Sequence, residues 1–238
     1  MGEAGEKPSS ERPDYLGHRK RLRERFLAGG STALADYELI ELLISQAQPR
    51  ADVKPVAKAL LKRFGSFAGV MAASPDALAE IDGVGDASIV ALKAVQAAAL
   101  LMQKQDLHQK PVLASWKSVL DYCHSAMAHE PIEQFRLLFL DGKNALIADE
   151  KQSQGTVNHT PVYVREVAKR ALTLDASAVI MAHNHPSGDP SPSRDDIEMT
   201  KAVKIALEKI GIQLHDHLII GRKGHVSLRS LGYLEGSP

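Results

Sequence analysis

The spacing of apolar positions separates the chain into a helical first part and a mixed second part. Between residues 35 and 102, apolar side chains recur every three or four positions, which is the period of an amphipathic α-helix. Gly65 ends one helical stretch. Ser74–Asp76 begins another, with an N-cap, a proline at the first helical position and an acid near the positive end of the helix dipole. A further helix is predicted from about 86 to 102.

After residue 115, helical and strand-like patterns alternate along the chain. The predicted helices are 116–127, 164–174 and 194–210, and the predicted strands are 132–140, 145–150, 178–181, 212–220 and 225–228. Asp-Gly-Lys-Asn at 141–144 predicts a tight turn between two strands. Strands mixed with helices over this length predict an α/β unit. The fold class expected is therefore α+β or α/β: an all-helical domain followed by a mixed β-sheet domain with flanking helices.

Local polarity predicts four segments. Residues 1–15 are polar and contain Gly, Pro and Ser, so we expect a disordered tail. Residues 16–102 form the helical domain. Residues 103–114, QKQDLHQKPVLA, are polar with one proline and are predicted to be a linker. The second domain then comprises residues 115–238.

Composition narrows the class of protein. Lys and Arg number 29 and are balanced by 29 Asp and Glu, so no global field attracts the chain to nucleic acid or to a membrane. No apolar run reaches the ~18 residues of a membrane span, and the first residues lack a signal-peptide core. Cys123 is the single cysteine, which excludes a disulfide framework and a cysteine-built zinc site. We expect a cytoplasmic protein.

Two features of the helical part leave DNA binding open. The stretch HRKRLRERF, His18–Phe26, is either a solvated helix face or a helix that contacts phosphates. The Gly-Val-Gly turn at 83–85 between two helices resembles a helix-hairpin-helix, whose loop amides and helix N-terminus can hold a DNA phosphate. However, Asp86 places an acid where phosphate would approach, and Ile89 replaces the usual small residue. Weak DNA binding and a purely structural hairpin therefore both remain as interpretations.

The most specific pattern is AHNHPSGDPSPSRDD, residues 182–196. The apolar run 178–181 predicts a buried strand, on which His183 and His185 point the same way, about 6 to 7 Å apart. A loop follows and a helix begins at Ser193, so Asp196 lies in its first turn and can reach back to the histidines. Two imidazoles and a carboxylate with an open fourth position are typical of catalytic Zn²⁺ sites. Ser193-x-x-Asp196 also has the form of a capping box, which is compatible with metal binding.

The full string resembles the JAMM (MPN-plus) metallopeptidase signature H-x-H-x7-S-x-x-D, and its HNHPSG motif resembles the bacterial RadC proteins. The resemblance covers about residues 18–234, including the Leu34–Leu39 run in the helical domain. It implies that His183, His185 and Asp196 hold Zn²⁺ and that a metal-activated water hydrolyses a peptide, isopeptide or other amide. A DNA-binding accessory role in repair or recombination is the alternative. A cupin-like iron or manganese site is a second alternative, disfavoured because Asp196 lies on a helix.

Hydrolysis by a metal-activated water also needs a base, usually a carboxylate. The residues alone offer Glu130, Glu133, Glu150 and Glu166. The resemblance implies Glu133, at the head of EQFRLLFL, with Glu150 as the runner-up. It also implies that Ser193 donates to the oxyanion, a contribution of ~3 to 4 kcal/mol where such donors have been removed.

A second histidine pair lies in His215-Asp216-His217. On the predicted strand 212–220 both histidines would face the same side, so a rival metal pair is conceivable. No further ligand follows at a helix start, and RadC proteins carry an Asp-His here that is not a ligand. Asp216 and His217 are therefore predicted to be structural or to support the ligands. His159 and His225 are predicted loop residues, and Val164 replaces a proline usual in RadC proteins.

Overall fold

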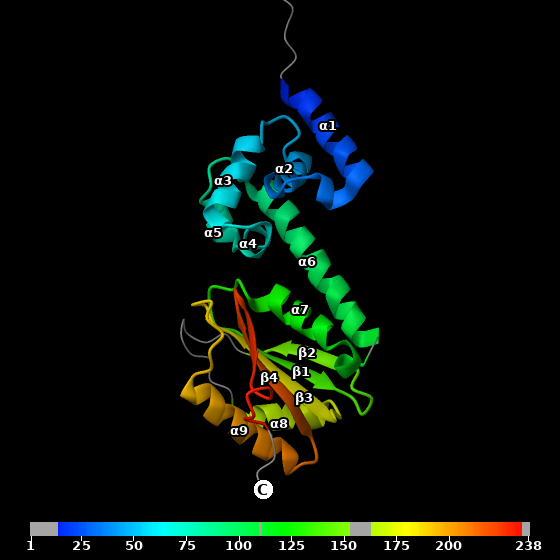
Figure 1. Ribbon diagram of the computed structural model, residues 1–238, viewed down its shortest axis with the longest axis vertical. Helices are drawn as coiled ribbons and strands as arrows, with labels where there is room; N and C mark the ends of the chain where they lie inside the picture. The colour runs from blue at the N-terminus through cyan, green and yellow to red at the C-terminus, as the bar shows by residue number, and fades with distance from the viewer. Residues whose placement is uncertain (1–13, 110, 153–162, 235–238) are drawn as a thin grey trace, which may run out of the picture. The chain divides into compact units, whose positions relative to one another are not determined.

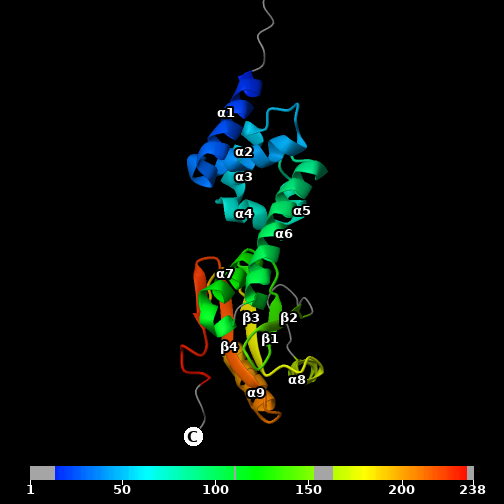
Figure 2. The ribbon, with the colours of Figure 1, turned by 90° about the vertical axis from the view of Figure 1, so that its right-hand side faces the viewer.

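The computed structural model describes residues 14–109, 111–152 and 163–234. The chain divides into two compact units, Met1–Gln96 and Ala97–Pro238 (Figures 1 and 2). The first unit is helical and the second contains a mixed sheet with flanking helices, which confirms the predicted fold class. Most of the predicted tail, residues 1–13, lies outside the described residues, and Asp14 already belongs to a helix.

The first unit is built from short helices around one apolar core. Its elements are α1 (Asp14–Gly29), the 3-10 turn η1 (Gly30–Ala33), α2 (Asp36–Ala47), α3 (Lys54–Phe64), α4 (Phe67–Ala72), α5 (Pro75–Ala79) and the first part of α6 (Asp86–Gln109). Gly65 ends α3 in the left-handed conformation, with φ 81°, and the Ser74 hydroxyl accepts from the Ala77 amide at the start of α5. The predicted stop and start signals are thus confirmed.

Only some of the basic residues of α1 are free to contact a ligand. Arg19 is buried, and its guanidinium donates to three backbone carbonyls between residues 48 and 51, where α2 ends. Arg25 forms a two-point ion pair with Glu38, with contacts of 2.8 and 2.9 Å. Leu22 is buried in the same helix. Part of the His18–Phe26 stretch therefore holds the domain together and is unavailable to a ligand.

The second unit is organised around a five-stranded sheet in the order β2-β1-β3-β4-β5. The strands are β1 (Phe135–Leu140), β2 (Leu146–Lys151), β3 (Ala178–Asn184), β4 (Gln213–Gly221) and β5 (Gly224–Ser227). β3 and β4 are parallel, whereas the other neighbouring pairs are antiparallel. The helices are η2 (Val112–Ser115), α7 (Trp116–Met127), α8 (Val164–Thr173), which begins at Val164 as predicted, and α9 (Arg194–Glu208).

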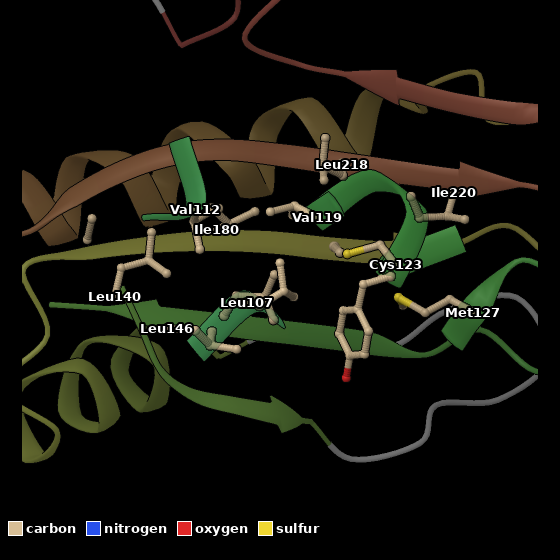
Figure 3. Packing of buried hydrophobic residues seen from close by; sticks show 14 of the residues in the cluster. Leu107, Val112, Val119, Cys123, Met127, Leu140, Leu146, Ile180, Leu218 and Ile220 are labelled. Carbon is tan, nitrogen blue, oxygen red and sulfur yellow. The ribbon is translucent and has the colours of Figure 1, made fainter. Parts of the chain in front are cut away.

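Each face of the sheet is covered by its own apolar cluster. One cluster places α7, Val112 and Leu107 against β1, β3 and β4; Figure 3 shows Val119, Cys123 and Met127 over these strands. The other cluster places α8 and α9 against the opposite face, through Val167 and similar residues. Because β3 is buried along its whole length between the two layers, its carboxyl end is a rigid position for functional side chains.

The predicted linker at 103–114 is wrong. α6 continues without interruption to Gln109 and is followed by η2. Leu107 is fully buried in the core of the sheet unit, and the Lys104 ammonium lies 3.4 Å from the carboxylate of Asp149 on β2. Burial of Leu107 and the ion pair of Lys104 with Asp149 outweigh the polar composition of the segment, which by itself suggested irregular structure.

α6 is the one helix, among the described residues, that is long and apolar enough to cross a membrane. Within Asp86–His108, an 18-residue window has a mean hydropathy of 1.2, and 11% of that window is buried. The Lys93 ammonium lies within this stretch and donates to the carbonyls of Met71 and Ala73, at 2.9 Å each. Leu92 belongs to the core of the helical unit. Length and composition are weak evidence for a membrane span in a helix that contributes to packed cores.

The extension of α6 leads to a prediction about fragments. A fragment starting at Ala97 should be more stable to urea than one starting at Lys110 by at least ~2 kcal/mol, because the shorter fragment lacks the Leu107 side chain and leaves a cavity on the sheet. Urea unfolding followed by circular dichroism measures the difference. A Leu107→Ala variant of the longer fragment separates the cavity from the loss of the helix. Equal stability of the three proteins would contradict the packing described above.

Candidate metal centre

The metal-ligand candidates meet at the carboxyl end of β3. His183 lies in the strand, His185 follows it directly, and Asp196 is in the first turn of α9. The loop between them is held by Arg222, whose guanidinium donates to the carbonyls of Pro186 and Ser187 at 2.8 and 2.6 Å. The turn from strand to helix is therefore fixed at both ends and in its middle.

The three side chains are arranged as a metal site requires. His183 Nε2 lies 3.0 Å from His185 Nε2 and 3.2 Å from Asp196 Oδ1, and His185 Nε2 lies 3.6 Å from Asp196 Oδ2. Ligands about 2.05 Å from a tetrahedral Zn²⁺ are separated from one another by about 3.3 Å. The donor atoms therefore lie at the spacing of a tetrahedral zinc site, and this is the one such cluster of three within the described residues. The chemistry and the geometry both fit Zn²⁺.

The tautomer of His185 is set by the loop. Its Nδ1 lies 2.9 Å from the backbone carbonyl of Asp189, which can only accept, so Nδ1 carries the proton. The neutral ring then presents a lone pair at Nε2, toward His183 and Asp196. Without a cation between them, three acceptors this close need a proton. Accordingly the hydrogen bond that the protonated ring donates to the Asp196 carboxylate raises the pKa of His185. A metal ion would replace that proton.

Asp196 is kept ionised by its surroundings. Partial burial favours the neutral carboxyl, but the close contacts of the carboxylate with His183 and His185 more than offset this, so the pKa of Asp196 lies well below its usual range. Its Oδ2 also accepts from the Ser193 amide and hydroxyl, at 2.8 and 2.6 Å, while the Ser193 oxygen accepts from the Asp196 amide. The predicted capping box is confirmed. It fixes the ligand carboxylate at the helix start.

Buried polar residues surround His183. Its ring stacks on Phe135, with centroids 5.8 Å apart and an interplanar angle of 9°. Its Nδ1 lies 2.8 Å from His217 Nε2, and His217 Nδ1 lies 2.6 Å from the Thr200 hydroxyl. Burial, which disfavours the imidazolium, keeps the pKa of His217 well below its usual value. The structure therefore agrees with the predicted supporting position of His217.

Glu133 lies just before β1, beside the metal-ligand candidates. Phe135 pairs with His183, and the Gln134 amide bonds the Asn184 side chain at 2.8 Å, so the antiparallel register places Glu133 opposite His185. Glu133 is half-buried, and its charge contributes to the raised pKa of His185. The carboxylate predicted as the base thus comes to the metal site, although β1 begins at Phe135, three residues later than expected.

Asn184 is a positioning residue that sequence reasoning missed. It is fully buried between the two histidines, and its Nδ2 donates to the carbonyls of Glu130 and Ile132, each at 3.3 Å. Together with its bond to the Gln134 amide, it ties the segment containing Glu133 to the end of β3. Its place between two ligand candidates was a signal, but its partners lie about fifty residues away.

The other candidate carboxylates have structural partners. Glu150, the runner-up, forms a two-point ion pair with Arg170 of α8, with contacts as short as 2.5 Å. The Glu130 carboxylate accepts from the Gln134 amide side chain. Glu166 is exposed and lies 3.9 Å from Lys169. Glu133 is therefore the glutamate of the four that the structure brings to the histidines.

The expectation that His215 and His217 share one face of the sheet is wrong. The β3–β4 register shifts between Val179, paired with Leu214, and Ile180, paired with Asp216, so His215 is the extra residue of a β-bulge. Its Nε2 lies 2.6 Å from Asn144 Oδ1, and it lines a separate cavity of about 480 Å³ beside Trp116. The bulge removes the rival metal pair.

Asp216 has a structural role. It is buried, and burial raises its pKa, but its oxygens accept from the His217 and Arg229 amides and from the Ser227 hydroxyl. These bonds join β4 to the end of β5.

Among the described residues, the remaining cysteine and histidines take no part in the site. Burial raises the pKa of the Cys123 thiol to about 12, so the thiol is not a nucleophile. His225 lies in β5, which agrees with the predicted strand 225–228 and corrects its description as a loop residue, and His159 falls outside the described residues.

Comparison with known proteins assigns a class to this arrangement. Residues 113–233 match the RadC-like JAB domain, and residues 15–90 match the UPF0758 N-terminal domain. The sheet unit is thus a JAB domain of the JAMM/MPN superfamily, a class often hydrolytic and typically metal-binding.

Relatives of full length agree with this class. A UPF0758 protein of Rhodobacter capsulatus is 59% identical over 213 residues, covering 90% of this chain and 100% of that protein. A UPF0758 protein of Ruegeria pomeroyi is 56% identical over 223 residues, covering 93% of this chain and 100% of its own length. The chain belongs to the RadC family, also called UPF0758.

Proposed function

We propose that this protein is a zinc-dependent hydrolase of peptide, isopeptide or other amide bonds. The observation that supports the proposal most directly is the convergence of His183, His185 and Asp196, whose facing donor atoms lie 3.0 to 3.6 Å apart. A bound Zn²⁺ would polarise an amide carbonyl and lower the pKa of a water molecule. With one cysteine and no cysteine ligand, the site suits a reducing cytoplasm, where we place the activity.

The residues around the ligands have distinct roles in this proposal. Glu133, opposite His185, takes the proton of the attacking water and passes it to the leaving amine. The Ser193 hydroxyl, which donates to Asp196 Oδ2 at 2.6 Å, turns to donate to the oxyanion as it forms. Asn184 keeps the Glu133 segment in place through its three backbone contacts.

The test has two stages. Elemental analysis of the purified protein should give about one zinc per chain. The zinc-loaded protein is then incubated with whole-cell peptides and proteins, and new amino termini are compared with those from a chelator-treated sample. Metal-dependent cleavage supports the proposal. Full zinc loading without cleavage of any amide in this screen contradicts the hydrolase, and an absence of bound metal contradicts the site itself.

A second candidate function is weak binding of DNA by the helical unit, favoured by the charge pattern of α3. Lys54, Lys58 and Lys62 recur every fourth residue and so form one ridge, and the helix contains no acid. Lys58 and Lys62 are exposed. α1 is less suitable because Arg19 and Arg25 are committed to internal contacts. We therefore propose the α3 ridge as the phosphate-contacting surface.

Replacing Lys54, Lys58 and Lys62 by Gln should lower the affinity for duplex DNA and flatten its salt dependence. Each lost phosphate contact reduces the slope of log K against log salt by ~0.9. Fluorescence anisotropy at several salt concentrations measures both quantities. The matched control replaces three exposed α1 cations, Lys20, Arg21 and Arg23, by Gln. If the control loses more binding than the α3 variant, or if both keep the wild-type slope, the ridge is not the DNA surface.

A further inference from the structure

A chain of hydrogen bonds links the two elements that carry the metal-ligand candidates. It runs from His183 Nδ1 to His217 Nε2, at 2.8 Å, and from His217 Nδ1 to the Thr200 hydroxyl, at 2.6 Å. Thr200 lies one turn after Asp196 on α9, and its hydroxyl donates to the Asp196 carbonyl at 2.5 Å. His217 and Thr200 are fully buried. The chain therefore joins a ligand on β3 to a ligand on α9, through β4.

The direction of every proton in this chain is determined at its Thr200 end. The Asp196 carbonyl can only accept, so the single hydroxyl proton of Thr200 is used there. The Thr200 oxygen must then accept from His217, which places a proton on His217 Nδ1. A neutral, buried His217 keeps a lone pair on Nε2, and that lone pair accepts from His183 Nδ1. His183 in turn carries its proton on Nδ1 and a lone pair on Nε2, the atom that faces His185 and Asp196.

We infer that Thr200 and His217 are positioning residues that hold His183 in the tautomer able to bind a metal ion. The inference rests on the proposed zinc site. It explains how the His183 ring holds a lone pair on Nε2 before a metal ion binds. His185 obtains the same tautomer from the Asp189 carbonyl. Both imidazoles therefore carry the proton on Nδ1 and present a lone pair at Nε2, although different partners hold the two protons. Partners of this kind around a ligand change metal affinity by ~10- to 100-fold when removed.

Loss of the Thr200 hydroxyl should reverse the direction of the hydrogen bond between His217 and His183. In Thr200→Val the shape is kept, but a proton on His217 Nδ1 would be a buried donor without a partner. The proton therefore moves to Nε2 and donates to His183 Nδ1, which forces the proton of His183 onto Nε2. Zinc must then displace that proton. Thr200→Ser keeps the hydroxyl and so keeps the proton of each histidine on Nδ1.

The experiment uses the full chain and two readouts. Zinc affinity is measured by competition with a chromophoric chelator, and the protonated nitrogen of each imidazole is read from ¹⁵N chemical shifts of the metal-free protein. Thr200→Val should bind zinc ~10- to 100-fold more weakly and carry the His183 proton on Nε2. Thr200→Ser should match the wild type in both. Thr173→Val is the control, because the Thr173 hydroxyl makes the same contact to the carbonyl four residues earlier, at 2.8 Å, at an exposed position of α8.

The outcomes separate this inference from the proposed function. Wild-type protein that binds no zinc contradicts the zinc site, while the ¹⁵N shifts still show whether Thr200 orders the protons. Wild-type protein that binds zinc, with a Thr200→Val variant of equal affinity or unchanged tautomer, overturns the inference alone. Weaker zinc binding by Thr200→Val and Thr173→Val alike, with unchanged tautomers, shows a general loss of stability and also overturns it.

Discussion

Replacement of Asp196 by Ala should reduce bound zinc from about one ion per chain to near zero. The carboxylate is one of three protein ligands in the proposed site and supplies its only negative charge, with oxygens 3.2 and 3.6 Å from the two histidine nitrogens. The loss should exceed the ~10- to 100-fold that removal of a ligand's hydrogen-bond partner costs. His183→Ala should have an equal effect, because its Nε2 faces both other ligands. Elemental analysis after extensive dialysis measures the metal content.

Two controls separate ligand loss from damage to the fold. Asp196 also belongs to the capping box of α9, where it accepts from the Ser193 amide, so Asp196→Ala loses one half of the box as well as a ligand. Ser193→Ala removes cap contacts but no ligand, and should keep its zinc. His215→Ala removes another buried histidine, which bonds Asn144 at the β-bulge, and this variant should also keep zinc. Zinc retained in Asp196→Ala, or lost in His215→Ala, would show that the metal is bound elsewhere.

Glu133→Gln should keep the metal and lose the hydrolytic activity. The amide has the shape of the carboxylate but cannot take a proton from water, and general-base catalysis contributes ~10²- to 10⁴-fold. The rate of a cleavage found with the wild-type protein, measured at saturating zinc, is the readout. Unchanged zinc content in the same sample shows that the effect is on chemistry.

The matched control for Glu133 is Glu150→Gln. Glu150 is the other glutamate considered as the base, and it pairs with Arg170, so its replacement should cost at most ~1 kcal/mol of stability and leave the rate nearly unchanged. A Glu150→Gln protein that is inactive beside an active Glu133→Gln protein would reverse the assignment. Equal activity of both variants would mean that neither carboxylate is the base.

The ligand candidates were predictable from the sequence because their arrangement is local. Alternation along β3 places His183 and His185 on one side, and the Ser193–Asp196 capping box returns a carboxylate to them within fourteen residues. Such geometry depends on strand pleat, turn and helix start, which short-range sequence specifies. The same holds for most helices and strands, whose ends differ from the predicted ones by a few residues.

Long-range pairing decided the remainder of the site. Residue types alone allowed four glutamates, and only the antiparallel register of β1 with β3 brings Glu133 opposite His185, fifty-two positions away. The β-bulge at His215 depends on how β4 pairs with β3, and a shift of one residue moves a side chain to the other face. Likewise, Thr200 and His217 meet only because α9 packs beside β4.

The sequence by itself thus determined the class of protein, the helical and mixed units, and the three candidate ligands. The tertiary structure decided which carboxylate accompanies them, that His215 is excluded, and that residues 103–109 continue α6. The physical reason is the same in each case. Contacts within one turn or strand are set by neighbouring residues, whereas Leu107 in the sheet core, Arg19 at the end of α2 and Glu133 beside His185 depend on burial and pairing between distant segments.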